Sequence, residues 1–392
     1  MTRPAQASAP FQFATATRIV FGAGTIAEVG PLARDLGRRA LVVTGRNPER
    51  AASLIDRLRQ HNLDSVVFSV PGEPDISLID QGVELARSQK CDLVIALGGG
   101  SAIDTGKAIA ALLGNPGELL DYLEVVGGGK SLASPAAPFI AVPTTAGTGS
   151  EVTRNAVIAS PEHRTKASLR SSHLLARAAI IDPELTHGLP RPLTAATGMD
   201  ALTQLIEPFV SCRANPLIDP LCLDGITRVV RSLSVACEQP DDVAARQDMA
   251  LASLFGGLAL ANAGLGAVHG FAGPIGGMFK APHGAICAVL LAPVMAANIR
   301  ALGIRQPQNQ ALARYQALAT LLTGDSTAQP QAAVDHIAQL VQQLEIPSLA
   351  TYGISSADVL PIVERALEAS SMKANPLPLT KDELTLTLTE AL

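Results

Sequence analysis

The chain has 392 residues, of which 47% are hydrophobic and 17% charged, so it can bury large cores and is not a disordered protein. Its length favours two domains over a single core. The formal net charge of −5, with no long basic run, leaves no electrostatic basis for binding nucleic acid. A small molecule is therefore the expected ligand.

The first half of the chain alternates short β-branched runs with amphipathic stretches, which is the pattern of a parallel sheet with crossover helices. The predicted strands are residues 18–21, 40–44, 65–70, 93–97, 139–142 and 179–182. The predicted helices between them are residues 50–60, 76–90 and 102–113. This half is predicted to be an α/β domain with a Rossmann-like parallel sheet.

Strand patterns end near Pro190, and long helical patterns replace them. These predicted helices are residues 199–211, 247–262, 285–298, 310–322, 332–344 and 357–369. The sequence GLPRP at residues 188–192 contains the glycine and prolines expected in a break between two such regions. We therefore place an α/β domain at residues 1–188 and an all-α domain at residues 189–392.

Two features bear on the compartment. The five cysteines are odd in number and form no Cys-x-x-Cys pair, which is the usage of a reducing compartment where thiols serve as small core residues. Residues 1–14 contain no apolar core of signal-peptide length, so we expect a cytoplasmic protein. Residues 251–279 lack Asp, Glu, Lys and Arg, but Asn262, Pro274 and many glycines interrupt them, so we expect a buried helix pair and no membrane partner.

A glycine-rich loop follows the predicted strand 93–97, and its residues are Gly98, Gly99, Gly100 and Ser101. A helix pattern comes next, so backbone N–H groups and the positive end of a helix dipole would face a phosphate there, with the Ser101 hydroxyl as a further donor. A P-loop is excluded because Ala108, not Ser or Thr, follows Lys107. The ordinary dinucleotide fingerprint is also excluded, because Ile103 takes the place of its third glycine.

A second loop, PTTAGTGSEVT at residues 143–153, follows the predicted strand 139–142. Clustered hydroxyls at the carboxyl end of a parallel strand are where such sheets bind ligands. The alternative is a turn in which Thr148 or Ser150 caps the next helix. Together with the glycine loop, this segment favours a nucleotide. The sequence GAGTIA at residues 22–27 is a weaker candidate cofactor loop, because no acid follows at the spacing that a ribose needs.

His269 and His283 lie in a glycine-rich stretch, residues 264–284, whose only permanently charged side chain is Lys280. Upstream, Asp200 and Gln204 are four residues apart, so both point from one face of a helix. A carboxylate with two imidazoles suits a divalent metal such as iron or zinc. A single histidine in an apolar stretch would be a core residue, but the joint arrangement predicts a cage of three strong ligands and a weak amide oxygen.

These motifs resemble those of the iron-containing (group III) alcohol dehydrogenase family over nearly the whole chain. They are GGGSAIDTGK at residues 98–107, PTTAGTGSEV at 143–152, GMDALT at 198–203, VHG at 268–270 and PHG at 282–284. The resemblance implies a dehydroquinate synthase-like architecture: a nucleotide-binding domain, a helical metal-binding catalytic domain, and a cleft for metal and nicotinamide. It also implies NAD(P)-dependent interconversion of an alcohol and an aldehyde or ketone by metal-assisted hydride transfer, a small substrate, and a homodimer.

The resemblance also implies roles for the four candidate metal ligands. The family uses one aspartate and three histidines, and the matching positions are Asp200, Gln204, His269 and His283, so the acid and the two histidines would act in catalysis through the metal. Gln204 departs from the pattern. It preserves the formal charge, but an amide oxygen is a poorer donor than imidazole, so we expect a weaker or exchangeable Fe²⁺ or Zn²⁺ site. Gly273, where many relatives carry another histidine, leaves no obvious general base, and His187 is only a speculative one.

Gly45 stands where many family members carry an acid that selects NAD. Because an acid would repel a 2′-phosphate and Arg46 could pair with one, we expect NADP(H) to be accepted or even preferred over NAD. The alternative for Arg46 is a solvated loop charge. The cofactor-binding residues expected from the resemblance are Gly45, Arg46, Gly98, Gly99, Gly100, Ser101, Asp104, Thr144, Thr145, Thr148 and Lys166.

Three alternatives stay open. Maleylacetate reductases also resemble this chain and reduce a keto acid without metal; Gln204 favours them, whereas Asp200, His269 and His283 argue against them. A cyclase of the dehydroquinate synthase type matches the motifs less well. From another class, the chain could be a catalytically silent nucleotide-binding protein.

Overall fold

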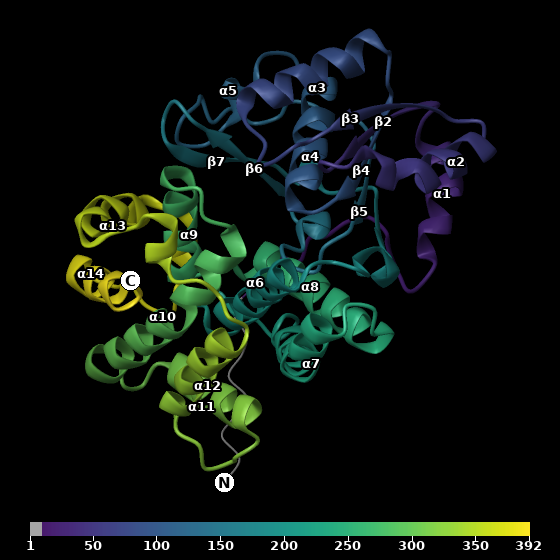
Figure 1. The fold of residues 1–392 in the computed structure, drawn as a ribbon. Helices are drawn as coiled ribbons and strands as arrows, with labels where there is room; N and C mark the ends of the chain where they lie inside the picture. The colour runs from purple at the N-terminus through teal and green to yellow at the C-terminus, as the bar shows by residue number, and fades with distance from the viewer. Residues whose placement is uncertain (1–9) are drawn as a thin grey trace.

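The computed structural model describes residues 10–392. It consists of a sheet domain and a helical domain, with α6 (Arg191–Val210) and α8 (Val243–Ala263) at their junction (Figure 1). We expected no signal peptide in residues 1–14. Residues 1–9 of that segment lie outside the described residues.

The sheet has six parallel strands in the order β1-β8-β5-β4-β2-β3. All six predicted strands are confirmed to within one residue at each end. β4, β5 and β8 are buried along their whole length, so they read in the sequence as continuous apolar runs. The strands are β1 (Ile19–Phe21), β2 (Arg39–Thr44), β3 (Asp64–Ser69), β4 (Leu93–Gly98), β5 (Phe139–Pro143) and β8 (Ala178–Ile181).

Helices cover both faces of the sheet. Leu41 and Val43 of β2 belong to one hydrophobic cluster, with residues of α3 (Ile76–Ser88) and α4 (Gly100–Gly114). Ala40 and Val42 belong to another, with residues of α1 (Val29–Leu36) and α2 (Ala52–Gln60). Successive strand residues point to opposite faces, so the sheet is doubly wound. A short helix, α5 (Leu119–Tyr122), follows α4.

We did not predict the antiparallel hairpin formed by β6 (Asn155–Ser160) and β7 (Thr165–Arg170). Burial alternates along β6, but its sequence NAVIAS has a central run of four apolar residues and no alternation of apolar with polar residues, so the pattern of a half-buried strand is absent. The hairpin packs β6 against α4 and β7 against α9 (Ala267–Met278). It therefore extends the sheet domain over the helical domain.

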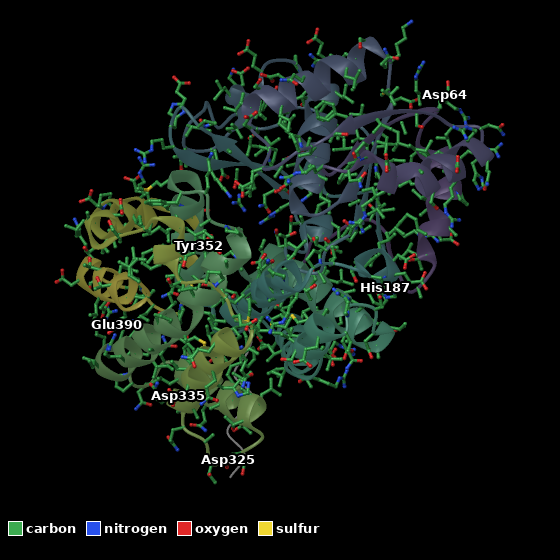
Figure 2. The ribbon with its side chains drawn as sticks, viewed as in Figure 1. Asp64, His187, Asp325, Asp335, Tyr352 and Glu390 are labelled. Atoms are coloured by element: carbon green, nitrogen blue, oxygen red, sulfur yellow. The ribbon has the colours of Figure 1, made fainter. Side chains whose placement is uncertain are left out.

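The helical domain begins at α6, and each of the six predicted helical stretches lies on a helix there. The α-helices not predicted are α7 and α14 here, and α1 and the short α5 in the sheet domain. Beside α6, α8 and α9, the helices are α7 (Asp219–Glu238), α10 (His283–Arg305), α11 (Gln310–Thr323), α12 (Pro330–Gln343), α13 (Val359–Glu368) and α14 (Lys381–Glu390). Charged side chains such as Asp335 and Glu390 lie on the outside of this domain (Figure 2).

The apolar stretch 251–279 forms the predicted helix pair, α8 and α9, whose axes differ by 101° at the glycine-rich break between them. α10 is long and apolar enough to cross a bilayer, but 72% of its most apolar window is buried within the protein. Burial of this extent is that of a core helix.

Candidate active site

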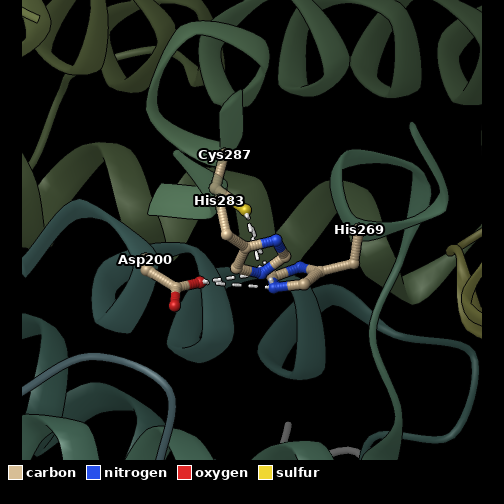
Figure 3. A group of neighbouring side chains, drawn as sticks. All are labelled: Asp200, His269, His283 and Cys287. Carbon is tan, nitrogen blue, oxygen red and sulfur yellow. Dashed lines mark hydrogen bonds and ion pairs between the residues drawn. The ribbon is translucent and has the colours of Figure 1, made fainter. Parts of the chain in front are cut away.

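Four side chains from three helices of the helical domain converge (Figure 3). Asp200 lies in the middle of α6, His269 in the first turn of α9, and His283 at the start of α10. Oδ1 of Asp200 lies 3.4 Å from Nε2 of His269 and 3.7 Å from Nε2 of His283. The structure thus brings together three of the four predicted metal-site residues.

The fourth member of this cluster is Cys287, which the sequence analysis assigned to the core as a small apolar residue. It follows His283 by one helical turn, so both side chains leave the same face of α10. Its Sγ atom lies 3.8 Å from Nε2 of His269 and 3.7 Å from Nε2 of His283. The potential ligand atoms of Asp200, His269, His283 and Cys287 all lie within 4.8 Å of one another. The spacing of four after His283 was the signal available in the sequence.

Gln204, one turn after Asp200 on α6, is also buried at this cluster. Its Nε2 atom donates to the carbonyl of Gly147 at 3.3 Å, whereas its Oε1 atom is buried without a hydrogen-bond partner. Oδ1 of Asp200 is likewise buried and accepts no hydrogen bond. Burying unpaired oxygens is costly. A divalent cation would satisfy both oxygens, so the residues present fit a metal ion.

Glu207 holds His269 in place, a role that the sequence analysis missed. Its Oε2 atom accepts from Nδ1 of His269 at 2.6 Å, and Oε1 accepts from the backbone N–H of Val268 at 2.7 Å. Gly266 leaves room for this contact, because a Cβ atom there would lie 2.8 Å from Oε1. Glu207 follows Asp200 by two helical turns, so the spacing on α6 could have indicated it.

The cluster favours the anionic forms of its acids. Burial raises the pKa of Asp200, but the charges of His283 and His269 outweigh it, so the pKa lies below its ordinary value. Burial likewise raises the pKa of the Cys287 thiol, and the same two imidazoles bring it below its ordinary value. Burial lowers the pKa of His269, but Cys287 and Glu207 raise it well above normal. Carboxylate, thiolate and neutral imidazole are the forms that bind a cation, so a metal ion would displace protons from the two histidines.

The two loops expected to bind a nucleotide lie against each other at the carboxyl ends of β4 and β5. The N–H of Thr144 donates to the carbonyl of Gly98 at 3.0 Å. A Cβ atom on Gly99 would lie 3.1 Å from Oγ1 of Thr145, and one on Gly100 would lie 3.0 Å from Cγ2 of Thr148. Because α4 begins at Gly100, its N-terminal amides, with Ser101 in the first turn, point to this edge of the sheet.

Asp104, expected among the cofactor-binding residues, bonds to protein groups. Its Oδ1 atom accepts from Ser150 Oγ at 2.5 Å and its Oδ2 atom accepts from the N–H of Val157 at 3.0 Å. The buried Nζ atom of Lys107 donates to the hydroxyls of Ser150 and Thr153, both at 2.9 Å. Burial lowers the pKa of Lys107 to about 8. These groups fasten α4 to the second loop. Ser150 begins a short 3-10 helix there, and Thr148 Oγ1 accepts from its N–H at 3.3 Å.

The second loop also contacts the helical domain. Gly147 accepts the hydrogen bond from Gln204, as described above. Gly149 has φ +56°, and a Cβ atom on it would lie 2.5 Å from Cα of Gly257 on α8. The loop after β5 therefore joins the glycine loop to the cluster of Asp200, His269, His283 and Cys287.

The other expected cofactor residues lie on the same side of the sheet domain. Gly45 follows β2, and a Cβ atom there would meet nothing within 4 Å. The exposed Arg46 donates through Nε to the carbonyl of Pro71 at 3.0 Å. Lys166 of β7 forms a 2.5 Å ion pair with Glu73.

Three further positions were considered from the sequence. A Cβ atom on Gly273 would meet nothing within 4 Å, so this turn of α9 borders open space. His187 lies in the segment that joins β8 to α6, at the edge of the junction between the domains (Figure 2). Residues 22–27 form a turn after the edge strand β1, where the N–H of Ile26 donates to Asp182 at 3.1 Å.

Residues 16–183 match the family model for iron-containing alcohol dehydrogenase, and residues 194–392 match that for the C-terminal domain of the same family. Alcohol dehydrogenase 4 of Schizosaccharomyces pombe is 36% identical over 372 residues, 93% of this chain and 85% of that protein. The 1,3-propanediol dehydrogenase of Citrobacter freundii is 36% identical over 367 residues, 91% of this chain and 92% of that protein. A crystal structure of 1,3-propanediol oxidoreductase superposes with a TM-score of 0.91 at 32% identity, covering 98% of this chain and 100% of that one.

Proposed function

The chain belongs to the iron-containing alcohol dehydrogenase family and is an NAD(P)-dependent alcohol/aldehyde oxidoreductase, and we propose that it acts on small primary alcohols and aldehydes with NADP(H). The observation that carries the proposal is the hydrogen bond from Gln204 to Gly147. It joins the loop beside the phosphate-binding glycines to the cluster around Asp200. A nicotinamide and a carbonyl oxygen would meet at this junction.

Asp200, His269 and His283 would hold a divalent metal, with the unpaired Oε1 atom of Gln204 as a further oxygen donor. When bound, the metal supplies Lewis acidity toward the substrate oxygen, and the nicotinamide supplies or accepts the hydride. Because amide oxygen is a weak ligand, the metal is exchangeable unless another side chain replaces the family's third histidine.

The protein's own groups position the reactants. Glu207 orients the imidazole of His269, and Lys107 with Asp104 fixes the second loop against α4. Gly273 leaves open space where a histidine would otherwise stand, so no side chain of α9 relays a proton at that position. Proton transfer would then need a water molecule or a hydroxyl group that lies close to the substrate.

NADP(H) is supported by the residues after β2. Gly45 presents neither a side chain nor a negative charge, and the exposed guanidinium of Arg46 keeps further N–H donors beyond the one used on Pro71. Glu49 is the only acid among residues 44–51. A 2′-phosphate at this position would gain charge-assisted hydrogen bonds from Arg46.

We propose that the enzyme is cytoplasmic, because cysteines stay free of disulfide bonds in a reducing compartment. All five are unpaired, and Cys222, Cys237 and Cys287 are buried. Cell fractionation with an antibody against the protein tests the location, which a periplasmic or membrane signal would contradict.

The function is tested with purified protein, NADPH and NADH, and a panel of straight-chain aldehydes together with an unsaturated keto acid. We expect reduction of short aldehydes, a higher kcat/KM with NADPH, and loss of activity on chelation that zinc or ferrous iron restores. Turnover of the keto acid alone, indifferent to chelator, would instead indicate a metal-independent reductase. Cofactor binding without turnover of any carbonyl would refute the proposal.

A further inference from the structure

We infer that Cys287 is a ligand of the metal, and that Asp200, His269, His283 and Cys287 together hold zinc in a near-tetrahedral set of protein ligands that can expand to admit a fifth ligand from the substrate. The inference concerns the same site as the proposed function and rests on it only for the presence of a metal. It assigns to a thiolate the place that the sequence analysis gave to Gln204.

Four of the six distances between ligand atoms of the cluster are close to those between ligands of one zinc ion. With zinc–nitrogen and zinc–oxygen bonds of about 2.1 Å and a zinc–sulfur bond of about 2.3 Å, a tetrahedron has edges of about 3.4 Å between nitrogen and oxygen and about 3.6 Å between nitrogen and sulfur. The Asp200 edges to His269 and His283 are 3.4 and 3.7 Å. The Cys287 edges to the same imidazoles are 3.8 and 3.7 Å. Four edges thus match before any ion is placed.

The surroundings of Cys287 distinguish it from a core cysteine. Cys222 and Cys237 are also buried, but they pack among the apolar residues of α7. Cys287 is fully buried, and its sulfur faces the ring nitrogens of two histidines. Oδ1 of Asp200, another of the proposed ligand atoms, is buried without a hydrogen bond, which independently favours a cation at this position.

Charge and ligand type favour Cys287 over Gln204 as the fourth strong ligand. One carboxylate and one thiolate neutralise a divalent ion, whereas the set with Gln204 leaves a net positive charge in a buried site, which is costly. Thiolate is a soft ligand that suits zinc, while neutral amide oxygen suits harder ions. Gln204 then remains bonded to Gly147.

X-ray absorption at the zinc edge tests the assignment in the full-length protein. We expect one sulfur neighbour at about 2.3 Å and nitrogen or oxygen neighbours at about 2.0–2.1 Å in the wild type. The sulfur signal is expected to vanish in Cys287→Ser and to persist in Cys222→Ser and Gln204→Ala. Zinc affinity is expected to fall about 100-fold or more in Cys287→Ser, because removing a ligand lowers metal affinity more than removing a residue that only supports a ligand.

Cobalt-substituted wild type gives a second readout that needs no variant to fold: a thiolate ligand produces a near-ultraviolet charge-transfer band. Zinc bound with only nitrogen and oxygen neighbours, a sulfur signal that survives Cys287→Ser, or no zinc binding would overturn the inference. Active enzyme without the sulfur signal contradicts the ligand assignment alone. A sulfur signal in protein that reduces no carbonyl contradicts only the proposed function.

Discussion

Nδ1 of His269 lies 2.6 Å from Oε2 of Glu207 in the buried space between α6 and α9. Because Glu207 accepts the Nδ1 proton, loss of the second proton from His269 leaves the Nε2 lone pair, on the side of Asp200 and Cys287, free to bind a metal ion. The other oxygen of Glu207 accepts from the N–H of Val268, the residue before the histidine. One carboxylate therefore fixes both the tautomer of His269 and the backbone that carries it.

Glu207→Gln is expected to weaken zinc binding by about 10–100-fold, the range for loss of such supporting contacts. The amide has one acceptor in place of two, so its NH₂ group faces either Nδ1–H of His269 or the N–H of Val268. Zinc affinity is measured by competition with a chromophoric chelator. Glu238→Gln, at an exposed position on α7, serves as the control. An unchanged affinity in Glu207→Gln would show that His269 needs no carboxylate to bind metal.

Arg46→Ala is expected to lower kcat/KM for NADPH about 10-fold or more, because a hydrogen bond between charged groups contributes about 1.5–3 kcal/mol. The value for NADH should change little, since that cofactor lacks the 2′-phosphate. Gly45→Asp should shift the preference from NADPH toward NADH, because the new carboxylate would repel the 2′-phosphate of NADPH. The open space around Gly45 accommodates the added side chain. Equal losses for both cofactors in Arg46→Ala would mean that Arg46 does not recognise the 2′-phosphate.

The sequence predicted the sheet better than the loops around it. Strands such as β4 and β5, buried on both faces, are apolar throughout, so their limits could be placed to within one residue. The hairpin of β6 and β7 was missed because its pairing depends on contacts with α4 and α9, which no local pattern records. Some helices were predicted too short. Their helical backbone continues beyond the apolar pattern into residues with polar side chains, such as Arg191 at the start of α6.

Gly149→Ala is expected to destabilise the protein by at least about 2 kcal/mol more than Gly129→Ala. Both glycines have nearly the same left-handed backbone, with φ +56° and +57°. Alanine there costs about 1–2 kcal/mol in conformation alone. A Cβ atom on Gly149 would also lie 2.5 Å from Cα of Gly257, whereas one on Gly129 meets nothing within 4 Å. The additional cost is that of overpacking backbone against backbone. Urea unfolding of both variants measures the difference, and equal losses would show that the loop shifts freely from α8.

The candidate site was predictable only in part, for reasons visible in single residues. Asp200, His269 and His283 carry metal-binding groups in a distinctive pattern, and the structure brings them together. Cys287 has a side chain that is equally common in cores, and only the neighbouring imidazoles of α9 and α10 distinguish it. The bond from Gln204 to Gly147 joins residues 57 positions apart, so it depends on how the domains pack.

Glu151→Gln is expected to remove a fall in stability that the wild type shows as the pH rises. Glu151 is buried beside Lys107, and burial raises its pKa from 4.5 to about 7. Between these values the unfolded chain has released the proton while the folded protein retains it, so the free energy of unfolding decreases with pH. Glutamine resembles the protonated acid and does not titrate. Relative to the variant, the wild type should therefore lose about 2–3 kcal/mol between pH 4.5 and pH 7.5. Urea unfolding at both pH values measures this, with Glu162→Gln at an exposed turn as the control. If wild type and Glu151→Gln change in parallel, the pKa of Glu151 in the folded protein equals its unfolded value, and the charge of Lys107 offsets the effect of burial.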